Sequence, residues 1–322
     1  MGIPDVTLSS ASSTRPLPVL GLGTGGYPFT FDAKKKLAVL HAIELGYHHL
    51  DTSSLYQTEQ GIGEAVAESL RRGLINSRAD LFITSKLWCT DAHSHGVIPA
   101  IRESLRNLKM DYLDLYLIHW PLSQKPGSCP FPIKSEDIVP LDLKSVWEAM
   151  EECQRLGLAK SIGVSNFTQK KLMELLEIAK IPPAVNQVEL NPVWQQVKLR
   201  EFCKEKGIHV IAYSPLGGQI SSSSRNLVME SEVLQDIAKA KGKSVAQVSL
   251  RWIYEQGACM VAKSLNKERL KENMEIFDWQ LNDEDHQKIS QIPQCKRISL
   301  HSLLSPEERS KSFDLLDYEI ID

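Results

Sequence analysis

Short apolar runs alternate with segments of helical periodicity over most of this chain. The apolar runs largely lack polar alternation, which is typical of parallel strands that are buried on both faces. We predict eight strands from them: Pro18–Gly23, His48–Asp51, Leu81–Lys86, Leu113–His119, Ser161–Val164, Ala184–Val188, His209–Tyr213 and Cys259–Lys263.

Helical patterns occupy the intervals between these strands. Asp32–Leu45 and Leu143–Leu156 each carry an apolar stripe at helical spacing, and Gly46 follows the first, where a helix is expected to end. Ser244 and Gln247 have the spacing of a capping box, which predicts that a further helix begins there.

Eight strand–helix units in series favour a closed parallel (β/α)8 barrel, the TIM-barrel architecture of the α/β class. A doubly wound sheet remains the alternative, because the order of the strands cannot be read from the sequence. Barrels of this kind commonly exceed ~150 residues as one unit, so we expect a single domain over residues 1–322. Residues 1–17 are expected to form a hairpin that closes the bottom of the barrel.

Three segments are longer than ordinary connections. Residues 121–141 contain five prolines, too many for a helix or a central strand, and residues 216–227 contain four consecutive serines. Both follow predicted strands on the face where barrel strands end, so we expect them to form walls of a substrate pocket. The C-terminal tail over 298–322 ends in acidic residues, which we expect to be solvated.

The bulk composition narrows the class of protein. With 42% hydrophobic and 24% charged residues and a net charge of -3, the chain is typical of a soluble globular protein without the basic stripe that nucleic acid requires. No apolar run approaches the ~20 residues that span a bilayer, and the N-terminus lacks the apolar core of a secretory signal. The six cysteines form no C-x-x-C pair, which indicates free thiols in a reducing cytoplasm and no metal site.

Four side chains of different character stand at the ends of successive predicted strands. Asp51 and Tyr56 follow the second strand, Lys86 ends the third, and His119 ends the fourth. Because the carboxyl ends of barrel strands meet at one face, we expect these four side chains to form one site. Taken singly, each has an ordinary structural explanation, such as packing for the tyrosine or a hydrogen-bonded core position for the histidine.

The four side chains suit the reduction of a carbonyl group. A tyrosine hydroxyl can protonate the alkoxide as it forms, and a neighbouring ammonium is expected to lower the pKa of that hydroxyl. Tyr56 is therefore the predicted proton donor and Lys86 the perturbing cation, with Asp51 as the carboxylate that keeps the lysine charged. Neutral His119 would polarise the carbonyl by donating a hydrogen bond.

The run Gly21–Gly26 matches the G-x-G-x-x-G pattern of dinucleotide-binding folds. In those folds the glycines open a helix directly, so that a pyrophosphate meets the helix N-terminus. Residues Tyr27–Phe31 intervene here before the helical pattern begins. We interpret the run as a barrel loop near the cofactor.

Several blocks of the sequence resemble motifs of the aldo-keto reductase family. They extend from Gly21 to about Trp279 and include HLDTSSLY, LFITSKLW, LDLYLIHWP, IGVSNF and AKSLNKERLKEN. The segments SVWEAMEECQRLGLAKSIGVSNF and GKSVAQVSLRW resemble the plant branch that contains codeinone reductase, methylecgonone reductase, chalcone reductase and deoxymugineic acid synthase. This resemblance implies NADPH as the cofactor. The implied substrate is a ketone or aldehyde of plant specialised metabolism, of the alkaloid or polyketide type.

The resemblance also implies the roles of individual residues. Asp51, Tyr56, Lys86 and His119 would be catalytic, as inferred above. Contacts with the cofactor would come from Gly23, Thr24 and Asp51; from Ser165, Asn166 and Gln187 at the carboxamide; from Tyr213 on the nicotinamide ring; from Ser214 and Leu216 at the pyrophosphate; from Lys263, Ser264 and Arg269 at the 2′-phosphate; and from Asn273 at the adenine.

Two groups of residues support this assignment independently. Lys263, Lys267, Arg269 and Lys271 form a cationic cluster in a faintly acidic chain, which suits a phosphate monoester, although a solvated helix face is the alternative. The second group consists of Asn166, Gln187 and Tyr213, which stand at predicted strand ends.

The residues expected to contact the substrate are Trp88, His119 and Trp120. The two tryptophans would provide flat apolar walls, unless they belong to the barrel core.

The chain departs from the family pattern at a few positions. Ser53 and Ser54 replace small apolar residues between Asp51 and Tyr56, so their hydroxyls are expected to perturb the tyrosine or to hold water. Ala262 replaces a proline before Lys263, which would loosen the grip on the cofactor.

Other functions remain open at this point. A barrel that binds NADPH but turns over poorly could act as a regulatory module. A barrel hydrolase that uses Asp51 or Glu189 lacks a matched acid and base pair. We expect a monomer acting on a small-molecule carbonyl, with transient contact to another enzyme of the pathway as an open alternative.

Overall fold

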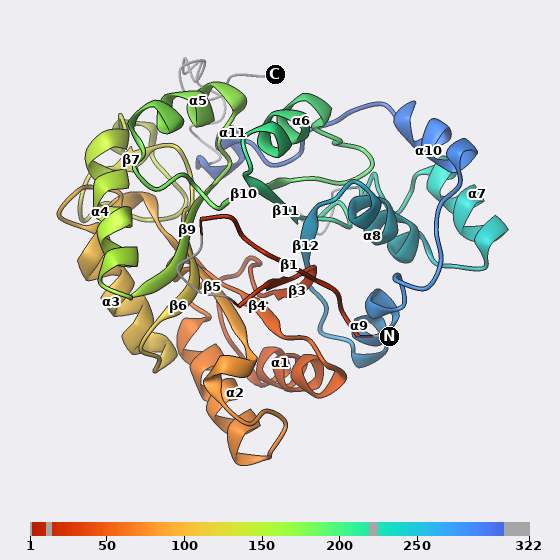
Figure 1. Ribbon diagram of the computed structural model, residues 1–322, viewed down its shortest axis with the longest axis horizontal. Helices are drawn as coiled ribbons and strands as arrows, with labels where there is room; N and C mark the ends of the chain where they lie inside the picture. Colours follow the sequence, from red (N-terminus) through yellow and green to blue (C-terminus); the bar gives the residue numbers. More distant parts are fainter. Residues whose placement is uncertain (1, 11–14, 219–224, 306–322) are drawn as a thin grey trace.

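Eight parallel strands close into a barrel in which each strand pairs with its neighbour along the sequence (Figure 1). This order confirms the predicted (β/α)8 fold and excludes the doubly wound sheet. The barrel strands are β3 (Leu20–Gly23), β4 (His49–Asp51), β5 (Phe82–Leu87), β6 (Leu113–Ile118), β9 (Ala159–Ser165), β10 (Val185–Glu189), β11 (His209–Tyr213) and β12 (Cys259–Ala262).

The computed structural model describes residues 2–10, 15–218 and 225–305. The serine run at 221–224 and the acidic end of the tail lie outside the described residues. Helices surround the barrel as an outer ring (Figure 1). They are α1 (Ala33–Leu45), α2 (Glu59–Arg71), α3 (Val97–Leu108), α4 (Leu143–Arg155), α5 (Gln169–Ile178), α6 (Val197–Glu205), α7 (Glu232–Lys241), α8 (Val245–Glu255), α9 (Lys267–Met274), α10 (Asp283–Ser290) and α11 (Leu300–Leu303).

The ends of the helices follow the signals in the sequence. Asp32 caps α1 by accepting a hydrogen bond from the backbone of Lys35, and Gly46 ends α1 in the left-handed conformation with φ 100°. Ser244 and Gln247 form the predicted capping box at the start of α8. Local side-chain chemistry therefore defines where these helices begin and end.

The predicted N-terminal hairpin is present. Strand β1 (Asp5–Val6) pairs antiparallel with β2 (Leu17–Pro18), which leads directly into β3. The hairpin therefore lies at the end of the barrel where the strands begin, as expected, and Figure 1 shows it in front of the barrel. No helix in the described parts of the chain is long and apolar enough to cross a membrane.

Residues 121–141 leave the end of β6 and form neither a helix nor a central strand. They contain the 3-10 turn η4 (Ser135–Asp137) and a two-stranded antiparallel sheet of β7 (Ser123–Gln124) and β8 (Ile138–Val139). Ile133 of this loop donates its backbone N–H to Leu303 in the first part of the C-terminal tail. The loop and the start of the tail thus pack together through a second hydrophobic cluster, made of Leu55, Trp88, Cys89, Trp120, Leu122, Ile133, Leu300 and Leu304.

Gly63 of α2 lies directly against the backbone at the end of α3. A Cβ atom added to Gly63 would lie 2.7 Å from the carbonyl carbon of Leu108, and this backbone cannot move independently of α3. We expect Gly63→Ala to lower the free energy of unfolding by about 1–3 kcal/mol, as measured by urea denaturation.

Without a steric clash, alanine would stabilise the helix more than glycine. Ala67→Gly on the exposed face of α2 measures this difference in helix propensity, and we expect it to lower the free energy of unfolding by about 1 kcal/mol. A Gly63→Ala variant as stable as the parent chain would contradict the steric argument.

Candidate active site

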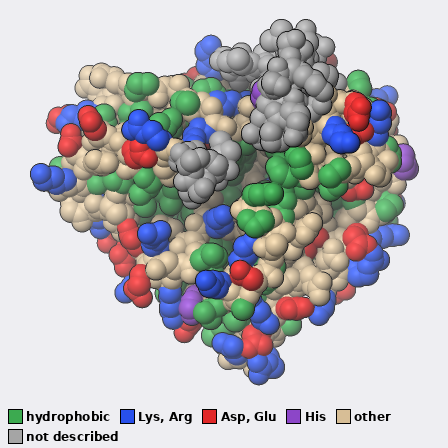
Figure 2. All heavy atoms as spheres, turned by 180° about the vertical axis from the view of Figure 1, so that it is seen from behind, with side chains coloured by type: hydrophobic (Ala, Val, Ile, Leu, Met, Phe, Trp, Pro, Cys, Tyr) green, Lys and Arg blue, Asp and Glu red, His purple; other side chains and the backbone are tan. Residues whose placement is uncertain are grey.

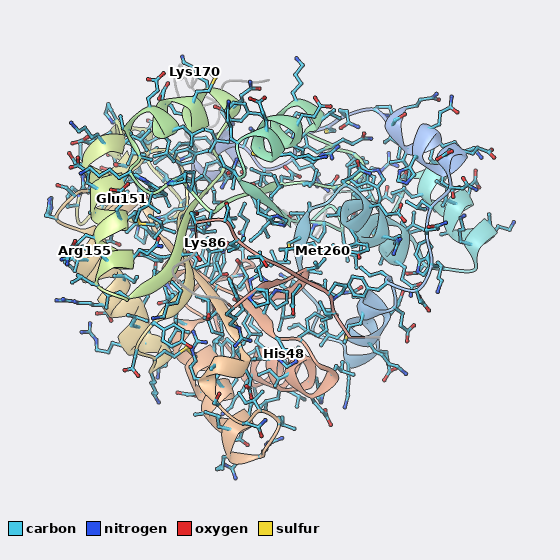
Figure 3. All side chains as sticks on the ribbon, in the orientation of Figure 1. His48, Lys86, Glu151, Arg155, Lys170 and Met260 are labelled. Carbon is cyan, nitrogen blue, oxygen red and sulfur yellow. The ribbon has the colours of Figure 1, made fainter. Side chains whose placement is uncertain are left out.

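A buried ion pair lies inside the barrel, where β4 and β5 end. The Lys86 ammonium donates to Asp51 Oδ1 at 2.6 Å and to the backbone oxygen of Thr52 at 2.8 Å. Lys86 is only 1% exposed and lies within the barrel, whereas Arg155 and Lys170 lie on the outer helices (Figure 3). Burial lowers the pKa of Lys86, and the carboxylate of Asp51 opposes this shift. The predicted pairing of these two residues is thus present.

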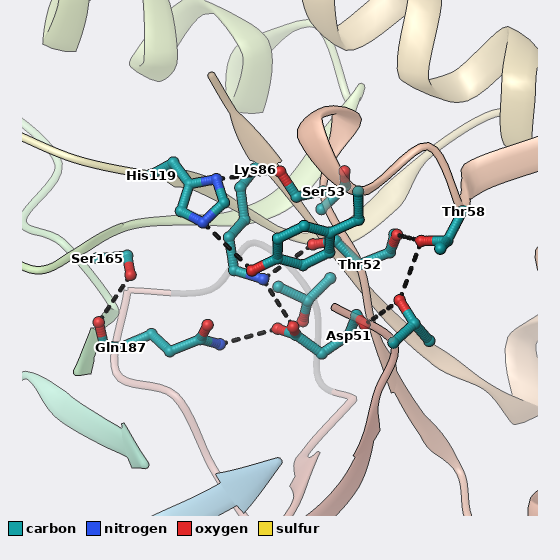
Figure 4. A network of polar contacts seen from close by, with 12 residues as sticks. Asp51, Thr52, Ser53, Thr58, Lys86, His119, Ser165 and Gln187 are labelled. Atoms are coloured by element: carbon teal, nitrogen blue, oxygen red, sulfur yellow. Dashed lines mark hydrogen bonds and ion pairs between the residues drawn. The ribbon is translucent and has the colours of Figure 1, made fainter. Parts of the chain in front are cut away.

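Gln187 supplies a second donor to the same carboxylate. Its Nε2 atom lies 2.8 Å from Asp51 Oδ2, so both oxygens of Asp51 are hydrogen-bonded (Figure 4). The sequence indicated only a role in cofactor binding for Gln187. Its reach across the barrel from β10 to β4 could not be read from local pattern.

Tyr56 and His119 meet directly above this pair. The tyrosine comes from the 3-10 turn η1 (Ser54–Tyr56), and its hydroxyl lies 3.3 Å from His119 Nε2. The Lys86 ammonium lies 5.1 Å from the centre of the Tyr56 ring. The four residues that the sequence placed at strand ends are therefore brought together.

The pKa of Tyr56 is raised, whereas the sequence led us to expect a lowered value. Burial raises the pKa of Tyr56 well above its usual value, and the negative charge of Asp51 raises it further. The ammonium does not reverse this shift, because Asp51 compensates its charge within the same site. Tyr56 is consequently a neutral hydroxyl that keeps its proton at neutral pH.

His119 is neutral as well. Burial lowers the pKa of His119 well below its usual value, and the nearby ammonium of Lys86 lowers it further. The imidazole therefore carries one proton, on either Nδ1 or Nε2. Its Nδ1 atom lies 3.0 Å from the hydroxyl of Ser53 (Figure 4). The hydroxyl of Ser53 thus reaches the histidine. The sequence had suggested instead that this hydroxyl would perturb the tyrosine or hold water.

The residues expected at the nicotinamide form one connected network. Ser165 donates to the backbone oxygen of Gln187 at 2.8 Å, and the Asn166 side chain donates to the backbone oxygen of His119 at 2.9 Å. The hydroxyl of Tyr213 donates to Asn166 Oδ1 at 2.7 Å. These side chains project from the ends of β9, β10 and β11, next to the site of Tyr56 and His119.

The cationic cluster provides a test of whether a phosphorylated cofactor fits. Lys267 is already paired with Glu44 at 2.8 Å, whereas Lys263 and Arg269 form no salt bridge among the described residues. Lys263 extends toward the loop after β3, where a Cβ atom on Gly26 would collide with its ammonium. Desolvation and then repulsion from Lys35 lower the pKa of Lys263, so a bound anion would stabilise its charge. This donor set fits a phosphate group.

Other predicted cofactor residues make contacts within the protein. Thr24 donates to the backbone oxygen of Asp51 and so connects the ends of β3 and β4, where Gly23 pairs with Asp51. Ser264 bonds to the backbone of Asn266, and Leu216 accepts a hydrogen bond from the side chain of Asn226.

Two further predicted residues occupy different settings. Asn273 is 2% exposed, and its contact with an adenine stays a prediction. Burial raises the pKa of the neighbouring Tyr47, and a hydrogen bond with Asn273 opposes this rise. Ser214 lies at the end of β11 with a left-handed φ of 49°, and its backbone oxygen accepts from Asn191.

Aromatic side chains line the approach to Tyr56. Phe29 stacks on Tyr56, with ring centres 6.0 Å apart, and Phe131 meets Phe29 edge-on at 5.3 Å. Tyr27, which is 78% exposed, packs its edge against Phe29. The sequence did not single out these three residues: the run of glycines marked the first loop and the prolines marked the second.

The two predicted substrate tryptophans are nearly buried. The indole N–H of Trp88 donates to the backbone oxygen of Pro130, and its ring meets His119 edge-on at 5.0 Å. Trp120 belongs to the same hydrophobic cluster. Their contact with a substrate stays a prediction. The face away from the hairpin is hollowed near its middle, and hydrophobic and basic side chains border the hollow (Figure 2).

No group of three or more histidine, cysteine, aspartate or glutamate side chains within the described ranges is placed to hold a metal ion.

The site consists of two neutral side chains that can form hydrogen bonds, Tyr56 and His119, and of the buried ion pair of Lys86 and Asp51 next to them. Such an arrangement can bind and protonate a developing oxyanion.

Comparisons with known proteins agree with this chemistry. Residues 19–294 match the sequence model of the Aldo/keto reductase family. The chain is 58% identical over 296 residues to 7-acetyl-epi-neemfruitin B aldo-keto reductase of Melia azedarach, covering 92% of this chain and 91% of that protein. It is 57% identical over 280 residues to deoxymugineic acid synthase 1-A of Triticum aestivum, covering 87% and 89%. Both relatives are plant proteins, as the sequence motifs indicated.

A solved structure has the same fold. The aldose reductase from Schistosoma japonicum superposes with a TM-score of 0.83 at 34% sequence identity, covering 92% of this chain and 96% of that chain.

We expect the stability of the fold to depend on pH through the buried side chain of His49. Burial is the main cause that lowers the pKa of His49 to about 4, and its Nε2 atom bonds to Thr84. The unfolded chain binds this proton near pH 6.5. The contribution of His49 to the free energy of unfolding is therefore fully present above that pH and is lost as the pH falls toward 4. We expect His49 to account for up to roughly 3 kcal/mol of this loss.

Urea unfolding between pH 7 and pH 4.5 measures the effect. His49→Gln should flatten the pH dependence by up to one proton, whereas Thr84→Val removes the hydrogen bond but keeps the imidazole and should leave the slope in place. Equal slopes in His49→Gln and the parent chain would show that His49 does not titrate in this way.

Proposed function

This chain belongs to the aldo/keto reductase family, and on that premise we propose that it reduces a ketone or aldehyde with NADPH, with Tyr56 as the proton donor. Members of the family generally use NAD(P)H. The observation that carries the proposal is the meeting of the Tyr56 hydroxyl and His119 Nε2 at 3.3 Å above the buried pair of Lys86 and Asp51. Two groups at this separation can both reach one carbonyl oxygen.

The residues of this chain would bind the cofactor and orient the carbonyl. When bound, NADPH supplies the hydride that the carbonyl carbon accepts. Ser165, Asn166 and Gln187 would hold the nicotinamide end, and Lys263 and Arg269 the phosphate of the adenosine. The unpaired state of these two cations among the described residues supports this assignment.

Tyr56 would transfer its proton to the oxygen of the substrate. Its raised pKa keeps the hydroxyl protonated at neutral pH, and an alkoxide is a stronger base than a phenolate, so the transfer runs downhill. The ammonium of Lys86 would stabilise the phenolate that remains, because it lies 5.1 Å from the centre of the ring. Asp51 and Gln187 keep this ammonium in place.

The substrate is proposed to be a bulky, largely apolar ketone or aldehyde of plant specialised metabolism, of the alkaloid or polyketide type. Phe29, Phe131 and Tyr27 provide an aromatic wall beside Tyr56, and aromatic walls bind flat apolar molecules. The similarity to a plant protein named 7-acetyl-epi-neemfruitin B aldo-keto reductase supports a substrate from plant specialised metabolism.

Replacing the tyrosine tests the role of its hydroxyl. Tyr56→Phe keeps the ring against Phe29 and removes the proton donor, so we expect kcat for NADPH-dependent ketone reduction to fall about 10²–10⁴-fold. NADPH affinity, followed by fluorescence quenching, should stay nearly unchanged. Full turnover in the variant would end the assignment of Tyr56 as the donor.

Replacing the two free cations tests the choice of NADPH. The double variant Lys263→Met and Arg269→Met should weaken NADPH binding by roughly 10–100-fold and leave NADH binding nearly unchanged, because only NADPH carries the 2′-phosphate. Lys239→Met, an exposed lysine of α7, is the matched control. Equal loss of affinity for both nucleotides would place the 2′-phosphate elsewhere.

A further inference from the structure

Ser53 occupies a fully buried position between the ion pair and the histidine. It is 0% exposed and stands at the N-terminal end of the turn that carries Tyr56. Its hydroxyl oxygen lies 3.0 Å from His119 Nδ1 and 3.3 Å from the backbone N–H of Leu55.

Counting hydrogen bonds assigns a direction to this contact. A serine hydroxyl has one proton to donate and two lone pairs to accept with, and the backbone N–H of Leu55 can only donate. In the described portion of the chain, His119 Nδ1 is the single acceptor within reach of the Ser53 hydroxyl. If Nδ1 carried the proton, the hydroxyl would be left as a buried donor without an acceptor, which proteins rarely tolerate.

We propose that Ser53 is a positioning residue that fixes the neutral tautomer of His119 with its proton on Nε2. The imidazole carries a single proton, because burial and the charge of Lys86 keep it neutral. This proton is therefore on one ring nitrogen or the other. Because Nδ1 accepts the hydrogen bond from Ser53, the proton is on Nε2.

The tautomer determines what Tyr56 can do. With the proton on Nε2, both His119 and Tyr56 are donors at 3.3 Å from each other, and both can point at one substrate oxygen. With the proton on Nδ1, Nε2 would accept the tyrosine proton and hold it away from the substrate. This consequence rests on the proposed carbonyl reduction, whereas the tautomer itself does not depend on it.

The tautomer can be measured directly by nitrogen NMR of the full chain labelled with ¹⁵N-histidine, without cofactor or substrate. His119→Asn identifies the signals of His119 among those of the other histidines. We expect a protonated Nε2 and a non-protonated Nδ1 in the parent chain. In Ser53→Ala, the signals of His119 should move toward a mixture of the two tautomers.

A matched control comes from the adjacent serine. The Ser54 hydroxyl donates to the backbone oxygen of Lys86 and does not reach the histidine, so Ser54→Ala should leave the tautomer unchanged. Ser53→Cys keeps a similar volume with a weaker donor and should give an intermediate result. It also serves as the test variant if Ser53→Ala does not fold.

Turnover gives a second readout. If the two donors act together in the transition state, Ser53→Ala should lower kcat and kcat/KM by the same factor, roughly 5–20-fold, with KM unchanged. A purely structural role for Ser53 would instead alter stability and KM without a tautomer change.

Several results would overturn the proposal. A parent chain with its proton on Nδ1 would do so, as would an unchanged His119 tautomer in both Ser53→Ala and Ser53→Cys. A shifted tautomer with unchanged kcat would show that Ser53 does not position the histidine for the reaction. Absence of any carbonyl turnover by the parent chain would refute the proposed function alone, because the tautomer measurement needs neither cofactor nor substrate.

Discussion

The buried pair of Lys86 and Asp51 is the interaction on which the rest of the site depends. Isolated charges are costly to bury, and two sets of contacts stabilise this pair. The ammonium reaches two oxygens, and both carboxylate oxygens receive a donor, one from Lys86 and one from Gln187. The pair joins β4, β5 and β10 across the inside of the barrel. Breaking any one contact would leave an uncompensated buried group, so the strand ends are held in a fixed relation.

Burial dominates the electrostatics above this pair. It raises the pKa of Tyr56 and lowers that of His119, so both groups are neutral when a substrate arrives. The ion pair next to these two neutral side chains has little net charge. Its ammonium therefore contributes most when negative charge develops on the substrate oxygen. In that state the ammonium stabilises charge in a poorly solvated setting, where such an interaction is stronger than in water.

The loops around the site are held by contacts with one another and with the barrel, and they carry aromatic side chains beside Tyr56. Trp88 anchors the loop over 121–141 through Pro130, and the same loop contacts the start of the tail through Ile133. The aromatic wall beside Tyr56 is built from two loops that are distant in sequence, at Phe29 and Phe131. A rigid barrel therefore holds the reacting groups, while the pocket that selects a substrate is formed by connections between strands and helices.

Sequence periodicity alone was sufficient to predict the eight strands, the capped helices and the strand-end positions of the four central residues, because each depends on local pattern and on the parallel geometry of a barrel. The cluster of Lys263, Lys267, Arg269 and Lys271 was visible as a local concentration of positive charge. The sequence did not predict that Gln187 bonds to Asp51, that Ser53 bonds to His119, or that burial outweighs the ammonium at Tyr56. Those facts depend on distances between side chains far apart in the chain and on how completely water is excluded from them, and only the folded barrel sets both.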